Sequence, residues 1–425
     1  MRLCSTLLLA LAMSTPAAAQ PLAPATAPAP GSPALSALVA DLEQHNPELL
    51  AAARAVDMRV ARIAPAGAPP DPTISTGYMS GFLRPPFFPS AATPDAFRQV
   101  GVSQEIPYPG KLALRSRVAS ADADVSRWRY EDTRLRLISE LKTAYVEYLF
   151  IERSLDVLRR NRTLLDQIRN IAEARFSVGK ASQPDVLRSQ LEISRLLQRQ
   201  SLLERQRWTL QADINRLAFR MPDSPVPIGE PLLLRSLDTS LADLRAEATA
   251  RFPGVKRDEQ QMARSQQALA LAKKEQRPDF GVNVTTQKPV GMSWMYGVDV
   301  MVRVPIFWQR RQRPMVAEAA AALEEARYMR DATVAEATAR VDQEYAAATS
   351  AKRLMLLFSD SILPQARLTL ESSTAAYEVG TIDFLTLLTN VTAVLESEIG
   401  YEEQTSQFRQ ALARLERLVD TTFIR

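Results

Sequence analysis

The spacing of apolar residues along this chain changes between two periods. Residues 112–176 contain no proline or glycine, and apolar or small residues recur there in steps of three and four. That is the seven-residue repeat of a coiled coil. A helix of about 65 residues is about 100 Å long at 1.5 Å per residue, so the sequence predicts a rod rather than a compact domain. The positions that carry the repeat are Leu141, Ala144, Tyr148, Ile151, Leu155, Leu158, Leu165, Ile168 and Ala172.

Four shorter segments alternate with a period of two, at residues 73–80, 97–106, 280–286 and 296–304. One face of the last segment holds valines, and the other carries Asp299, Met301 and Arg303; Glu105 has the same place in the second segment. This alternation suits a channel wall with an apolar outside and a wet inside. A half-buried soluble sheet would give the same pattern, so the strands alone leave both structures open.

The same series of predicted elements, a helix, a β-hairpin and a long helical hairpin, occurs twice along the chain. Pro47 and Pro72 lie 25 residues apart, as do Pro253 and Pro278, and a Val-Gly pair follows each long helical stretch. We therefore predict two structural repeats, at 35–217 and 241–425, joined by an equatorial linker at 218–240. Each repeat has a helix, a β-hairpin (72–107 or 278–305) and a long helical hairpin whose tip lies near 178–181 or 379–382.

The first 34 residues differ in composition from the rest. Arg2, an apolar run at 3–13 and Ala17-Ala18-Ala19 predict a signal peptide over 1–19, and a Pro/Ala-rich leader at 20–34 is expected to be disordered. Cys4 is the only cysteine, so no disulfide and no lipid-attachment cysteine is expected in the mature protein. Lys+Arg 52 against Asp+Glu 48 gives no sign of a nucleic-acid footprint.

Four strands are too few to close a barrel, and an open sheet edge in lipid leaves backbone groups without hydrogen bonds. Identical chains would therefore have to pool their strands, and three chains would supply 12. The predicted fold is mainly α, with a transmembrane β-barrel contribution and a long α-helical coiled-coil tunnel.

Several short runs, in order, resemble the TolC family of outer-membrane efflux proteins over residues 35–421. They lie at 102–111 after the first predicted β-hairpin, at 304–307 after the second, and at the two tips, 175–179 and 377–381. The resemblance implies a homotrimer with a 12-stranded outer-membrane barrel and a periplasm-spanning helical tunnel. It also implies a periplasmic adaptor (membrane fusion protein) and an inner-membrane pump, expected to be of the resistance-nodulation-division (RND) type, as partners. The run Gln-Glu-Ile-Pro-Tyr-Pro-Gly-Lys is similar to sequences in the heavy-metal branch of the family, which resembles CusC and CzcC. Members of that branch often carry a lipidated N-terminal cysteine, which this chain lacks.

The same resemblance implies the sites of a passive duct. Adaptor docking is expected at the tips, and the periplasmic gate just beyond them, where Asp185 with Arg188 and Asp383 would form charge pairs between helices; a solvated helix face is the alternative. Asp299, Met301, Arg303 and Glu105 are expected on the barrel lumen. The tip residues are Val178, Gly179, Lys180, Val379, Gly380 and Thr381, and the gate also includes Thr386 and Thr389.

Nothing in the sequence predicts catalysis, a cofactor or a metal site. His45 is the only histidine, and Met292, Met295 and Met301 could either guide Cu(I) or fill space. The expected function is the outer-membrane channel of a tripartite efflux system for metal cations or small toxic compounds. A type I protein-secretion duct and a soluble periplasmic coiled-coil scaffold or adaptor are the alternatives, and the sequence does not name the cargo or the cognate pump.

Overall fold

A computed structural model describes residues 33–79, 96–229, 239–289 and 291–424. The predicted signal peptide and residues 20–32 of the predicted leader lie outside these ranges. Pro33 and Ala34, at the end of that leader, begin a helix instead, because Leu35 and Leu38 of the same helix pack into the core. The helices are α1 (Pro33–His45), α2 (Pro47–Ala61), α3 (Ile63–Gly67), α4 (Lys111–Ser177), α5 (Gln183–Leu217), α6 (Leu241–Arg251), α7 (Pro253–Lys274), α8 (Gln312–Leu357), α9 (Leu363–Val379) and α10 (Phe384–Val419).

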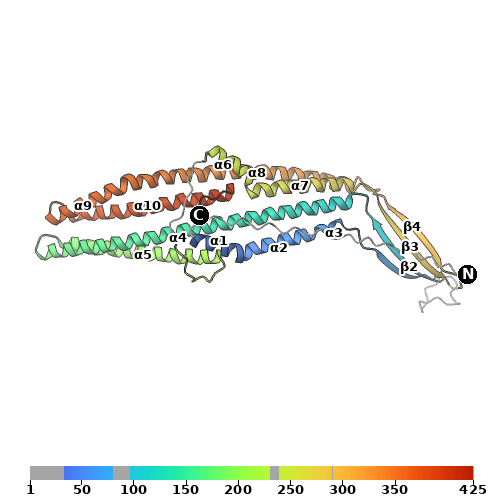
Figure 1. The fold of residues 1–425 in the computed structure, drawn as a ribbon, viewed down its shortest axis with the longest axis horizontal. Coiled ribbons are helices and arrows are strands. Elements are labelled where there is room, and N and C mark those ends of the chain that lie inside the picture. The colour runs from blue at the N-terminus through green and yellow to red at the C-terminus, as the bar shows by residue number, and fades with distance from the viewer. Residues whose placement is uncertain (1–32, 80–95, 230–238, 290, 425) are drawn as a thin grey trace.

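The molecule is a long rod of helices with a sheet at one end, as Figure 1 shows. Two helical hairpins, α4 with α5 and α9 with α10, end together at the opposite extremity. Helix α4 has 67 residues, and all but one of the residues that carry its seven-residue repeat are buried; the exception, Ala144, packs against the core half-buried. Among the described residues, no helix carries an apolar stretch sufficient to cross a bilayer.

The sheet contains the strands β1 (Thr73–Met79), β2 (Phe97–Ile106), β3 (Asp279–Pro289) and β4 (Met295–Arg303), in that order and all antiparallel. The central pair joins the two halves of the chain, since Ile106 of β2 lies opposite Phe280 of β3. One edge of β1 and one edge of β4 have no neighbouring strand among the described residues.

Two apolar cores hold the rod together. The first forms a waist at its middle, where α1, α4, α7, α8 and α10 meet residues 423–424. The second lies between the two hairpins toward the tips and includes Leu165, Ile168, Tyr377 and Leu387.

The second long helix is interrupted where the first is continuous. Between α8 and α9, the segment Phe358–Ile362 is a π-helix, in which the Leu363 amide donates to the Phe358 carbonyl. Pro364 follows directly; it has no N–H, and its ring would crowd the carbonyl four residues earlier in an α-helix. The wider turn removes that conflict.

Candidate functional site

The two faces of the sheet differ in chemistry. Matching positions of all four strands form an apolar row, Ile74–Val102–Val284–Val298, and this row faces outward with Ile74 75% and Val298 69% exposed. Each neighbouring row contributes an exposed valine, Val100 on one side and Val300 on the other. A contiguous apolar surface of this kind marks a face that contacts lipid or another protein.

The opposite face is polar and closely packed. A Cβ at Gly101 would lie 3.0 Å from Ser75 Oγ and 3.1 Å from Thr285 Cγ2, and a Cβ at Gly297 would lie 2.9 Å from Thr285 Oγ1. Glycine at these places therefore lets small polar side chains of neighbouring strands approach one another. This face is the one on which the lumen residues were predicted.

The structure brings three of those predicted lumen residues together near the helical end of the sheet. Arg303 Nη1 lies 2.7 Å from Glu105 Oε1, and the ion pair spans β3 at Gly281. Met301 lies beside Gly281 under this pair. Asp299 lies farther along the strand, where its carboxylate accepts from Asn283 at 3.3 Å. Glu105, Met301 and Arg303 line an open hollow of about 430 Å³ that also includes Asp71 and Asp279.

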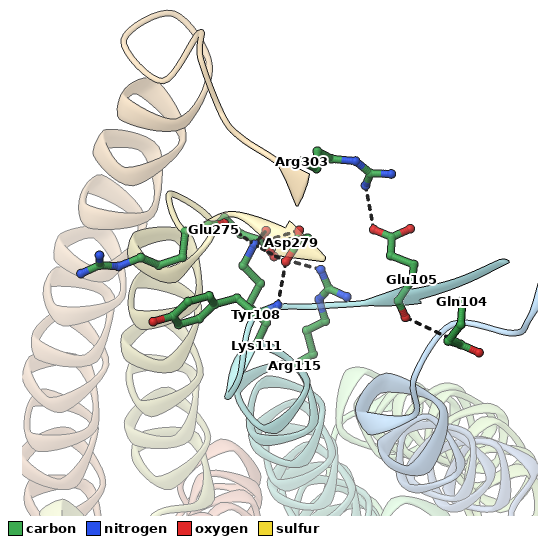
Figure 2. A network of polar contacts seen from close by, with 9 residues as sticks. Gln104, Glu105, Tyr108, Lys111, Arg115, Glu275, Asp279 and Arg303 are labelled. Atoms are coloured by element: carbon green, nitrogen blue, oxygen red, sulfur yellow. Dashed lines mark hydrogen bonds and ion pairs between the residues drawn. The ribbon is translucent and has the colours of Figure 1, made fainter. Parts of the chain in front are cut away.

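A buried lysine fixes the sheet to the helices. Lys111 begins α4 with its side chain 1% exposed, and its ammonium donates to both Asp279 carboxylate oxygens at 2.9 and 3.0 Å and to the Arg277 carbonyl at 2.9 Å. Glu275 lies 3.1 Å from the same ammonium. Figure 2 shows this cluster where the start of α4 meets the start of β3, so it connects the first repeat to the second.

The chain reaches Lys111 through a turn that requires glycine. Gly110 has φ +87°, and a Cβ there would lie 2.3 Å from Lys274 Nζ. The Tyr108 amide next to this turn donates to Asp279 Oδ1 at 2.7 Å. From the sequence, this Pro-Gly-Lys run was used only as a mark of resemblance, and the buried contact of Lys111 with Asp279 was not predicted. The signal in the sequence was a lysine placed among apolar residues and glycine.

Both predicted tips are reversals through left-handed glycines. Gly179 has φ +72° and Gly380 has φ +86°. The Thr381 amide donates to the Ala376 carbonyl at 2.9 Å, and the Lys180 amide to the Arg175 carbonyl at 2.8 Å, which closes the end of each helix. Val178 and Val379 stand 66% and 76% exposed at these turns.

Arg175 joins the two tips and was not predicted as a site residue. Its guanidinium donates to the Tyr377 and Glu378 carbonyls at the end of α9 and lies 4.8 Å from the centre of the Tyr377 ring. Tyr377 in turn packs edge-on against Phe384 of α10. A cation at a helix C-terminus is stabilising, so Arg175 holds the end of the second hairpin against the first.

The predicted gate residues begin the return helices. Asp185 accepts from the Ser182 amide at 3.1 Å, and Asp383 accepts from the Thr386 amide at 3.3 Å and from its hydroxyl. These hydrogen bonds from Thr386 hold the pKa of Asp383 below its usual range, with the charge of Arg188 a smaller cause. Within the described part of this single chain, Asp185 and Arg188 make no ion pair, and Thr389 donates to the Leu385 carbonyl at 2.8 Å.

Residues 38–218 match the family described as outer membrane efflux protein. This match agrees with the expected resemblance over residues 38–218. The match covers the first repeat, and comparisons of structure extend the efflux-protein fold over both repeats. A comparison with curated protein sequences finds no match.

Solved structures of outer-membrane channels share this fold. VceC of Vibrio cholerae is 15% identical with a TM-score of 0.78, over 92% of this chain and 96% of that one. The outer-membrane channel OprN is 16% identical with a TM-score of 0.81, over 92% and 91%. CusC is 13% identical with a TM-score of 0.79, over 91% and 92%.

Proposed function

We propose that three copies of this chain form a passive duct across the outer membrane, with the four-stranded sheets pooled into one 12-stranded barrel. The observation that carries this proposal is the sheet itself, which has an exposed apolar face, a polar face and two unpaired edges. Edge strands in lipid leave backbone N–H and C=O groups without partners, at several kcal/mol each. Because β1 and β4 run antiparallel to each other, β4 of one copy can pair with β1 of the next and leave no edge.

Oligomeric state and conductance test this proposal together. Detergent-solubilised protein should be a trimer by light scattering and should form pores in planar bilayers. Val300→Asp, on the apolar face, should reduce assembly in membranes, because a charge facing hydrocarbon is costly. Asp299→Asn, one residue away on the polar face, is the matched control and should assemble normally. A monomer that forms no pores, or release of the protein by osmotic shock as expected of a soluble scaffold, would contradict the duct.

The tips are the proposed docking surface for a periplasmic adaptor. Val178 and Val379 present exposed apolar side chains at the α4–α5 and α9–α10 turns, beside Gly179, Lys180, Gly380 and Thr381. These two turns lie at the far end of the rod (Figure 1). Such exposed apolar groups at a rigid turn suit a helical partner. Cysteines at 178 and 379 should crosslink to the adaptor in cells, whereas a cysteine at the exposed Leu191, farther along α5, should not.

Asp185 is the proposed gate residue because it begins a return helix at the closed end of the tunnel. In a trimer the three Asp185 carboxylates would lie around one axis, and charge pairs to Arg188 of a neighbouring helix would hold the ends together. Asp185→Ala should raise the closed-state conductance, and Glu371→Gln, which removes an exposed carboxylate of α9 outside the gate, is the control. Unchanged conductance in Asp185→Ala would leave Asp185 as a helix cap alone.

The proposed cargo is metal cations or small toxic compounds delivered by an inner-membrane pump of the RND type. Support comes from the run at residues 104–111, which is similar to the heavy-metal branch. Loss of the gene should lower resistance to metal salts more than to uncharged drugs. Loss of a secreted protein from the medium, with resistance unchanged, would favour the secretion duct instead.

A further inference from the structure

The segment that leads from β4 into α8 is exposed except at Pro305 and Gln312, which are half-buried. This basic connector comprises residues 304–313, and Ile306 is 76%, Phe307 74% and Trp308 47% exposed. Large apolar side chains gathered so closely are unusual on a surface that faces only water. They require a partner.

Three arginines follow the apolar residues directly. Arg310, Arg311 and Arg313 are exposed, and within the described ranges none of their guanidinium groups forms an ion pair. Their backbone amides are held in place, since Arg310 and Arg311 donate to the Phe307 carbonyl at 3.0 Å and Arg313 to the Trp308 carbonyl at 2.8 Å. The connector therefore presents three unbalanced positive charges on an ordered turn.

The order of residues along β4 and the connector follows the polarity profile of a bilayer. At the far end are Trp294 and Tyr296, 54% and 79% exposed, and alternate valines then continue the apolar face as far as Val304. Nine strand residues span about 30 Å, close to the thickness of the apolar layer of a membrane. Aromatic residues at both ends of an apolar band, with arginines just beyond, are typical of the two membrane–water interfaces.

We propose that the basic connector is a membrane anchor at the periplasmic surface of the outer membrane. Ile306, Phe307 and Trp308 lie at the boundary between acyl chains and headgroups, and Arg310, Arg311 and Arg313 bind the phosphates of anionic phospholipids. The inference rests on the proposed duct, because it places the sheet in a bilayer.

Charge favours lipid over a second copy of the chain as the occupant. If β4 pairs with β1 of a neighbouring copy, the residues preceding that β1 come closest to the connector. Asp71 is the sole carboxylate between residues 62 and 79, and it cannot balance three guanidinium groups. Phospholipid phosphates can, because each basic residue near an anionic surface changes partitioning on the order of five-fold.

Fluorescence quenching by brominated lipids tests the anchor. The trimer is reconstituted in vesicles of phosphatidylcholine and phosphatidylglycerol, with one or the other lipid brominated. One variant keeps only Trp308, with Trp128, Trp208 and Trp294 replaced by Phe; its companion keeps only Trp294. Brominated lipid should quench both tryptophans, and phosphatidylglycerol should be preferred at Trp308 by on the order of five-fold for each arginine that reaches a headgroup.

The triple variant Arg310→Gln, Arg311→Gln and Arg313→Gln should lose this preference while remaining a trimer. Its matched control replaces Arg199, Arg205 and Arg353 by Gln, which removes the same charge from exposed helix positions that form no ion pair among the described residues, and it should keep the preference. A preference unchanged in the connector variant would overturn phosphate binding.

Quenching of Trp294 without quenching of Trp308 would overturn the anchor but leave the duct intact, because the connector would then lie beneath a second copy. Quenching of neither residue would overturn the anchor and the membrane-embedded sheet together. Trp294 thus separates the two failures.

Discussion

The two repeats pass from sheet to helix in different ways, although both use a proline after the strand. In the first repeat the turn at Gly110 leads to a lysine that is 1% exposed and bound to residues of the second repeat. In the second repeat the corresponding segment exposes Phe307 and Trp308 and contacts little of the rest of the chain. The connector between sheet and helix therefore binds the other repeat in the first half of the chain, whereas in the second half it forms an exposed surface.

The difference shows which copy carries the mechanical connection. The Lys111 cluster connects β2, β3, α4 and α7 (Figure 2). The orientation of the sheet relative to the helices is therefore fixed by the first connector and not by the second. Substitutions in the first connector should then act on stability, and those in the second on interactions outside the chain. Substitutions at Lys111, Gly110 and Phe307 examine this contrast, and one at Gly400 examines the packing of the second long helix.

Lys111→Met should lower the free energy of unfolding by about 3 kcal/mol, because it leaves the Asp279 carboxylate and the Arg277 carbonyl without their buried cation. Guanidinium titration of the detergent-solubilised protein measures the change. Adding Asp279→Asn should restore part of the loss, since the uncompensated charge is then gone. A Lys111→Met protein as stable as the parent would show that the joint lies elsewhere.

Gly110→Ala should cost about 2 kcal/mol, mostly from left-handed strain at φ +87°, with a smaller part from displacing the flexible Lys274 side chain, whose Nζ would lie 2.3 Å from the new Cβ. Gly179→Ala is the matched control, because its φ is +72° but nothing lies within 4 Å of its added Cβ. The same titration should show a smaller loss for the control, of about 1 kcal/mol. Equal losses would mean that the contact with Lys274 contributes nothing.

Gly400→Ala should destabilise the second repeat by about 1 kcal/mol. The Phe358 ring of the π-helical segment would lie 2.8 Å from the new Cβ, and this crowding exceeds the gain in helix propensity. Thermal unfolding followed by circular dichroism checks it, and Phe358→Leu in the same chain should relieve the loss. Stabilisation by Gly400→Ala alone would mean that the ring moves aside freely.

Phe307→Ser should change the stability of the detergent-solubilised protein by less than about 0.5 kcal/mol, as expected for an exposed residue. Tyr108→Ser, in the first connector, is the partner substitution and should cost more because the Tyr108 side chain is half-buried, whereas that of Phe307 is exposed. If the two losses were equal, the contrast between the connectors would fail.

Sequence periodicity predicts much of this architecture. The seven-residue repeat places Leu141, Leu155 and Ile168 on the buried side of α4, and the alternation in β4 separates its valines from Asp299 and Arg303, as the strand register bears out. Both patterns are local, so a single sequence contains them.

Contacts between distant segments could not be predicted in the same way. Lys111 and Asp279 are 168 residues apart, and Arg175 reaches Tyr377 across 202 residues. No periodicity links such positions, because each pair depends on how the two repeats pack. The π-helical segment was also not predicted. Pro364 was visible in the sequence, but a kink, a break or a wider helical turn can each accommodate a proline, so the residue alone does not choose among them.

The waist brings together the two extremes of the described chain. Leu35 and Leu38 share one apolar core with Phe423 and Ile424, and Glu416 accepts hydrogen bonds from the amides of both latter residues while pairing with Lys142 of α4. The middle of the rod therefore cannot close before residues 423 and 424 have been synthesised. Chains that stop short of them keep this apolar surface uncovered, which makes them targets for chaperones and proteases.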